Sequence, residues 1–129
     1  MNTATATEVL GEPLEMAAFS PVAYFDKHMD CIRVIVRDCS VTEHRIDEMF
    51  TLMEDNHPNR FGHRYVGFTI KGVRHLFDEL DLPLGRVYKI ADILHEIVKK
   101  WPTSTIAIVS DVILDSADES SDLAVDMAA

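Results

Sequence analysis

Alternating hydrophobic and polar residues predict an antiparallel β-sheet in the first half of the chain. Residues 30–38 contain the densest run of β-branched side chains, with Ile32, Val34 and Val36 on one face of a strand and Arg33 on the other. We interpret this run as a central strand with one dry face and one partly wet face.

Two neighbouring segments extend this sheet. A short strand at 22–25 and a turn at 26–29 precede the central run, which together predict a β-hairpin. Residues 64–71 predict a further strand, in which Gly67 stands on the face opposite the aliphatic side chains. A glycine at such a position indicates a close backbone approach or a bulge.

The segment from residue 40 to 55 fits two structures. Ser40 and Glu43 have the spacing of a capping box, and hydrophobic residues from Ile46 to Met53 would line one side of a helix. The same residues also fit two strands, at 41–46 and 49–53, with Phe50 and Leu52 pointing inward. Periodicity alone leaves both possibilities open.

The second half of the chain carries helical patterns. Residues 73–80 predict a short helix, and residues 86–101 predict a long amphipathic helix that Pro102 ends. Residues 105–109 predict a last strand. The chain is therefore expected to form an α+β fold, an antiparallel β-meander of four to five strands packed by one long and one short helix.

Composition divides the chain into three parts. Residues 1–20 are expected to form a loosely ordered leader, residues 21–114 a single α+β domain, and residues 115–129 an acidic tail. The tail contains acids and no base, so we expect it to be dispensable for folding. Its alternating Leu123 and Val125 suggest that it adds a strand to the edge of a partner.

The net charge of −10 is unevenly distributed. All 12 lysines and arginines lie between residues 27 and 100, together with 12 of the 22 acids, so the excess negative charge lies in the two ends. A neutral body with acidic ends disfavours direct binding of nucleic acid. No apolar run reaches the roughly 18 residues that a membrane span requires.

The two cysteines indicate a reducing compartment. Cys31 and Cys39 would stand about 26 Å apart along an extended chain, whereas a disulfide requires Cα atoms within about 7 Å. The first 19 residues contain no base and do not resemble a secretory signal. Together these features predict a cytoplasmic protein.

Candidate chemistry is sparse. The six histidines show none of the short spacings that metal sites use, so we expect no metal and no cofactor. Asp26 and Asp30 at the first hairpin turn, with His57 and His63 in the loop at 56–63, are the candidate catalytic residues. Aspartates in turns commonly accept hydrogen bonds from turn amides, which favours a structural role for both.

The segments Tyr24-Phe25-Asp26 and Ile32-Arg33-Val34, with Asp30 between them, resemble the opening hairpin of a small bacterial domain family of unknown function. Members of that family continue with a strand before an acidic turn and close on a Val-Gly-Ile-Glu-Ile-like strand. Residues 47–55 and 65–70 are similar to these two strands. The resemblance covers about residues 22–73, and it implies strands rather than a helix between residues 40 and 55. It implies no activity.

We interpret the chain as a small interaction or regulatory protein that self-associates, because a thin two-layer domain leaves apolar surface for a second copy. One alternative is a small enzyme with its site at the first hairpin turn and the loop at 56–63. Another is an acidic, antitoxin-like partner of a basic protein. The expected interaction residues are mainly aromatic or lie in the tail: Phe61, Tyr88, Trp101, Leu123 and Val125.

Overall fold

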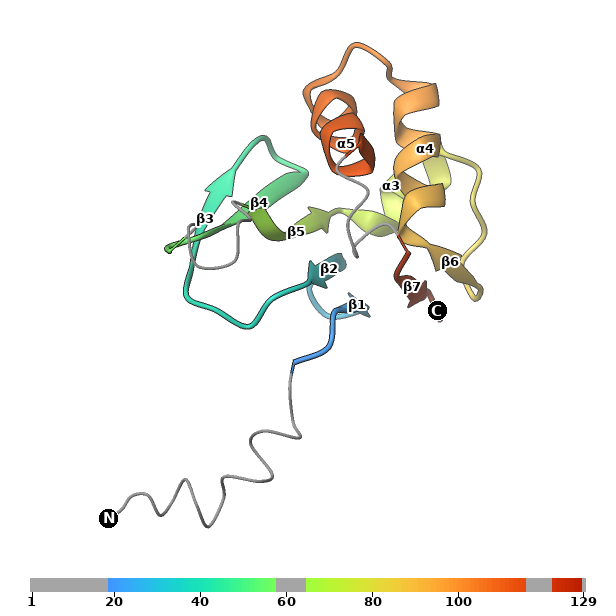
Figure 1. Cartoon of the computed structure of the whole chain (residues 1–129). Helices are drawn as coiled ribbons and strands as arrows, with labels where there is room; N and C mark the ends of the chain where they lie inside the picture. Colours follow the sequence, from blue (N-terminus) through green and yellow to red (C-terminus); the bar gives the residue numbers. More distant parts are fainter. Residues whose placement is uncertain (1–18, 58–64, 116–121, 129) are drawn as a thin grey trace, which may run out of the picture.

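The fold is α+β, as the sequence predicts (Figure 1). The computed structural model describes residues 19–57, 65–115 and 122–128. Within them, an antiparallel five-stranded sheet, a two-stranded ribbon and three helices are present. The sheet strands are β1 (Val22–Asp26), β2 (Cys31–Ile35), β3 (Val41–Arg45), β4 (Phe50–Asp55) and β5 (Tyr65–Lys71). The remaining elements are α3 (Val73–Glu79), β6 (Val87–Lys89), α4 (Ile90–Lys100), α5 (Thr105–Asp115) and β7 (Ala124–Asp126).

The strand order of the large sheet is β1-β2-β5-β4-β3. Strands β3, β4 and β5 follow one another as a meander, and β5 then pairs with β2. The chain therefore crosses from β2 to the far edge of the sheet before it returns. Both strands predicted between residues 40 and 55 are present, which confirms the strand interpretation of that segment.

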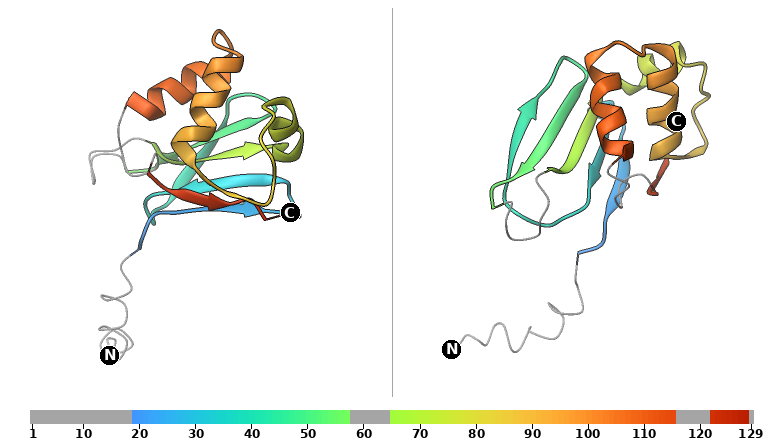
Figure 2. Two further views of the ribbon diagram at one scale, coloured as in Figure 1. Left: turned by 90° about the vertical axis from the view of Figure 1, so that its right-hand side faces the viewer. Right: turned by 45° about the horizontal axis from the view of Figure 1, so that its top comes forward.

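The hydrophobic core lies between the sheet and the helices, which gather on one side of it (Figure 2). Ile32, Phe68 and Phe50 come from three adjacent strands and are fully or almost fully buried. The rings of Phe50 and Phe68 stack with their centroids 5.3 Å apart. The predicted short helix is confirmed as α3, and it buries Val73, Leu76 and Phe77 against this core. None of the helices in the described ranges combines the length and apolarity that a membrane crossing requires.

The predicted strand at 105–109 is wrong, because these residues begin helix α5. Its β-branched residues favour strands, but tertiary packing overrides this preference. Ile106 and Ala107 are buried on its inner face. The Ser104 hydroxyl accepts a hydrogen bond from the amide of Ala107 at 3.1 Å and thus caps the start of the helix.

The structure also differs from the prediction of a dispensable acidic tail. Residues 124–126 form β7, which pairs with β6, and the side chains of Val125 and Met127 are fully buried. The backbone of Met127 exchanges two hydrogen bonds with the chain before β6, one from Gly85 at 2.8 Å and one to Arg86 at 2.9 Å. Residues 122–128 are therefore part of the domain. The same pairing explains why α4 begins at Ile90 rather than at the predicted residue 86.

Candidate binding pocket on the polar face of the sheet

The first hairpin turn uses its two aspartates for structure. Asp26 accepts hydrogen bonds from the backbone amides of His28 and Met29, both at 3.0 Å. Asp30 adopts a left-handed conformation with φ 53° and accepts a hydrogen bond from the Arg74 amide at 3.1 Å. Both carboxylates thereby stabilise the turn and its contact with α3, and these contacts give the catalytic prediction no support.

The loop candidates are not assembled into a site. His57 is exposed, and its backbone amide donates to the Asp55 carboxylate at 2.8 Å. His63 and Phe61 lie outside the described residues. Among the residues that the structure places, no group of three histidines, cysteines or acids could hold a metal ion.

The other expected interaction residues take part in the packing of the domain. Tyr88 is half-buried, its ring meets that of Phe77 edge to face at 5.3 Å, and its hydroxyl donates to the Pro83 carbonyl. Trp101 and Leu123 are half-buried against the core, and Val125 is fully buried. The buried side chain of Val125 is not exposed to a partner.

A row of polar side chains crosses the face of the sheet opposite the core. The strand register aligns Arg33 of β2 with Thr69 of β5, and Thr69 with Thr51 of β4. Tyr24 and Arg45 extend this row to the two edge strands. Side chains at paired positions lie on the same face of a sheet, so the row brings together residues that are far apart in sequence.

A pocket of about 150 Å³ opens over the centre of this row. We call it the polar pocket. Its lining comes from strands β2, β3, β4 and β5 and from Met29 of the hairpin turn. The other residues that line it are Cys31, Arg33, Glu43, Thr51, Thr69 and Lys71.

Three buried polar atoms in this pocket have no hydrogen-bond partner in the protein. They are Oγ1 of Thr51, Oγ1 of Thr69 and Nε of Arg33. The two threonines are only 3% and 5% exposed. Leaving a buried polar group unpaired costs about 1–3 kcal/mol, so three such groups on adjacent strands are an energetically costly feature of this face.

The side chains that line the pocket carry more positive than negative charge, although Asp26 and Asp30 of the adjacent turn add negative charge near Cys31. Arg33 and Lys71 contribute two positive charges, against one negative charge from Glu43. This positive balance contrasts with the net charge of −10 of the whole chain. A guanidinium, an ammonium and two hydroxyls together offer the hydrogen-bond donors that carboxylate and phosphate oxygens accept.

The pocket thiol is not set up as a nucleophile. Burial raises the pKa of Cys31 above the usual thiol range, and the charge of Asp26 raises it further. Arg33 and Lys71 act in the opposite direction, but the balance remains upward. Since the thiolate is the reactive form, Cys31 stays protonated and unreactive at neutral pH.

This difference predicts the order of cysteine modification. Cys39 is half-buried in the β2–β3 connection and forms no disulfide, whereas Cys31 is 4% exposed. At pH 8 iodoacetamide is expected to alkylate Cys39 at least about 10-fold faster than Cys31 in the folded protein, because Cys39 is more exposed and burial raises the pKa of Cys31. Peptide mass spectrometry over time measures both rates, and unfolding in urea should equalise them. Faster modification of Cys31 would contradict its assigned environment.

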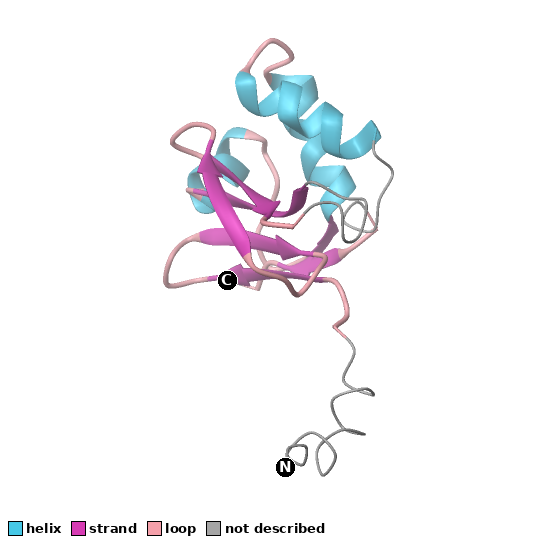
Figure 3. Cartoon of the chain, turned by 60° about the vertical axis from the view of Figure 1, so that its left-hand side comes forward, coloured by secondary structure: helices cyan, strands magenta, loops and turns pink. Residues whose placement is uncertain are grey.

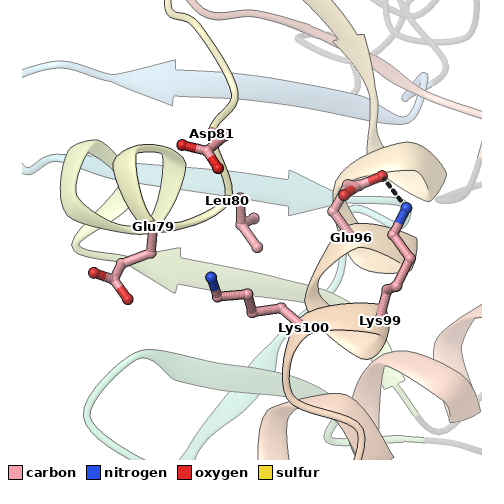
Figure 4. Close-up of a pocket in the computed structure, with 6 residues that line it drawn as sticks. All are labelled: Glu79, Leu80, Asp81, Glu96, Lys99 and Lys100. Atoms are coloured by element: carbon pink, nitrogen blue, oxygen red, sulfur yellow. Dashed lines mark ion pairs between the residues drawn. The ribbon is translucent and has the colours of Figure 1, made fainter.

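A second pocket, between α3 and α4, is more open (Figure 4). It measures about 210 Å³, and Lys100 extends across it from α4 toward α3. Glu96 and Lys99 form an ion pair at 3.3 Å on its rim. Among the unpaired buried atoms of the described residues, none belongs to this pocket. Its charged side chains are therefore exposed to solvent or paired with one another. It lacks the buried, unpaired hydrogen-bond donors that distinguish the polar pocket.

No protein-family model, curated protein or solved structure matches this chain. The resemblance to a small bacterial domain family therefore stays a prediction. The function rests on the geometry of the polar pocket alone.

Sequence reasoning did not identify Thr51 and Thr69 as site residues. Thr69 stands opposite the aliphatic face of its strand, and Thr51 stands between the two residues of its strand that are expected to point inward, Phe50 and Leu52. The missing information was the cross-strand register that places both beside Arg33. A polar residue in the middle of several strand patterns, as Arg33, Thr51 and Thr69 are, is the signal that points to such a row.

Proposed function

We propose that the protein is a non-catalytic binding module whose polar pocket recognises a carboxylate or phosphate group. The supporting observation is the set of unpaired donors, Arg33 Nε and the hydroxyls of Thr51 and Thr69, beneath a pocket with a positive balance of charge. An ionised oxygen that reaches these buried donors would gain charge-assisted hydrogen bonds.

A binding role is favoured over the enzyme alternative because the nearby reactive groups are held in unreactive states. Cys31 has a raised pKa, and Asp26 accepts two turn amides. The antitoxin-like alternative would bind a basic protein through the acidic tail, but residues 122–128 pack in the domain. An interaction module acting in the reducing cytoplasm fits the absence of a disulfide between Cys31 and Cys39.

Isothermal titration calorimetry with sodium phosphate tests this proposal, with chloride at equal ionic strength as the reference. Arg33→Gln is expected to weaken phosphate binding about 10-fold or more, since a hydrogen bond to a charged group contributes about 1.5–3 kcal/mol. Arg86→Gln is the matched control, because Arg86 is exposed near β6, far along the chain from the pocket, and the charge change is identical. Binding in wild type that Arg33→Gln leaves unchanged would contradict the proposal.

Thr69→Val separates a binding role from a structural one. The substitution removes the unpaired hydroxyl and keeps the side-chain shape. It is expected to weaken phosphate binding while raising the free energy of unfolding of the ligand-free protein by about 1 kcal/mol, because the penalty of the unpaired group disappears. If the hydroxyl served only to stabilise the fold, Thr69→Val would lower the free energy of unfolding instead.

A second titration distinguishes the two sources of the anionic group. N-acetyl-aspartyl peptides present a carboxylate as an acidic side chain of a protein partner would, whereas phosphate represents a free small anion. Binding of the peptide without binding of phosphate assigns the pocket to protein recognition. Failure of both ligands to bind at millimolar concentration would overturn the proposal.

A further inference from the structure

The outer edge of β3 is an unpaired strand edge. β3 stands last in the sheet order, and among the described residues no segment pairs with its far side. All five of its residues are exposed or half-exposed, and its pairing with β4 is regular. Proteins usually protect such edges with prolines, bulges or charged side chains. The sequence Val-Thr-Glu-His-Arg contains no proline, and its charges are one acid and one base, which a second copy can pair. The opposite edge strand, β1, lies beside β7 (Figure 2).

The pattern of hydrogen bonds between β3 and β4 determines which residues of β3 direct their backbone groups toward the outer edge. The amide of Ile46 donates to Phe50 at 2.8 Å, and the carbonyl of Ser40 accepts from Asn56 at 3.0 Å. The even-numbered residues therefore bond to β4. Because the direction alternates along a strand, the odd-numbered residues Glu43 and Arg45 direct their backbone N–H and C=O groups away from the sheet.

We propose that two copies of this chain associate through their β3 edges, in an antiparallel register centred on His44. In this register Glu43 of each copy stands opposite Arg45 of the other, and symmetry produces the pair twice. Both residues have outward backbone groups, so the hydrogen-bond phase also matches.

Two alternative registers, centred on Glu43 and on Thr42, lack this complementarity within β3. A register centred on Glu43 brings the two Glu43 side chains face to face, which is unfavourable because like charges directly opposite repel. A register centred on Thr42 places Val41 opposite Glu43 and leaves no pair of opposite charges. Charge therefore selects the register centred on His44, and the two sheets join into one continuous sheet (Figure 3 shows the strands of one copy).

His44 occupies the two-fold axis without blocking it. Its Nε2 lies 2.6 Å from Glu54 Oε1, a contact that directs the imidazole toward β4 and away from the second copy. The two His44 residues form a non-hydrogen-bonded pair, in which the Cα atoms of opposing residues lie about 4.5 Å apart. That spacing is compatible with a disulfide.

Sedimentation velocity in phosphate-free buffer tests the association. The wild type is expected to show twice the 14.6 kDa mass of one chain at micromolar concentration. Glu43→Arg places like charges opposite each other and is expected to weaken the dimer at least about 10-fold. The double variant Glu43→Arg/Arg45→Glu restores both pairs and should restore the dimer. Asp78→Arg on α3 changes the charge by the same amount and should have no effect.

Cross-linking tests the register itself. In a Cys39→Ser background, His44→Cys is expected to form an intermolecular disulfide under mild oxidation. Thr42→Cys should not form one, because the two Thr42 residues stand four positions apart along the strands, about 13 Å. Melting temperatures near that of the background verify that both variants fold. A monomer at all concentrations, or equal cross-linking at both positions, would overturn the proposal.

Discussion

Deleting residues 122–129 is expected to lower the free energy of unfolding by at least about 4 kcal/mol, which is enough to unfold a marginally stable domain. The deletion removes two fully buried side chains, Val125 and Met127. Burial of each contributes about 1.5–3 kcal/mol, and the exposed core that remains adds to the loss. It also removes the only partner that β6 has among the described strands.

Urea denaturation followed by circular dichroism measures this loss. Deleting only residues 128–129 is the matched control, because Ala128 is exposed and Met127 keeps its hydrogen bonds to Gly85 and Arg86. The control should unfold at the same urea concentration as the full chain. An unchanged midpoint for the longer deletion would restore the interpretation of these residues as a dispensable tail.

Replacing Gly67 with alanine is expected to cost about 3 kcal/mol. A Cβ atom at this position would stand 2.4 Å from the carbonyl oxygen of Val34 and 3.1 Å from the sulfur of Met53. The first contact is with the backbone of the paired strand, so β2 and β5 must separate to relieve it. Overpacking of this kind usually costs 1–3 kcal/mol, and contact with a backbone places it at the upper end.

Gly72→Ala is the comparison for this experiment. Gly72 has φ 65°, and a Cβ atom there meets nothing within 4 Å. Its substitution costs only the left-handed conformation, about 1–2 kcal/mol. Thermal unfolding should therefore rank Gly67→Ala as the less stable variant. The reverse order would contradict the close approach of the two strands.

The sheet was predictable where a strand pattern was local. β2 and β5 alternate clearly between apolar and polar residues, and the position of Gly67 correctly indicated a close backbone approach. β4 was harder because it is buried on both faces, which removes the alternation that distinguishes a strand from a helix. Helix α5 was missed because its β-branched residues have the composition of a strand.

The remaining errors come from pairing between distant segments. β7 is short, polar on one face and surrounded by acids, so its sequence indicates a solvated tail. Its stability comes from pairing with β6, which lies some 35 residues earlier and which no local pattern reveals. The polar pocket was missed for the same reason, because Thr51, Thr69 and Arg33 meet only through the strand register.

The most direct test of the proposed pocket is the NMR signal of the Arg33 Nε–Hε group during titration with phosphate. This atom is buried and has no hydrogen-bond partner in the structure, so its resonance reports ligand binding directly. A saturable shift of the Arg33 signal, together with the amides of Thr51 and Thr69, is the predicted result. The Arg86 side chain should show no saturable shift. An Arg33 signal that stays unchanged at saturating phosphate and acidic peptide would contradict the account.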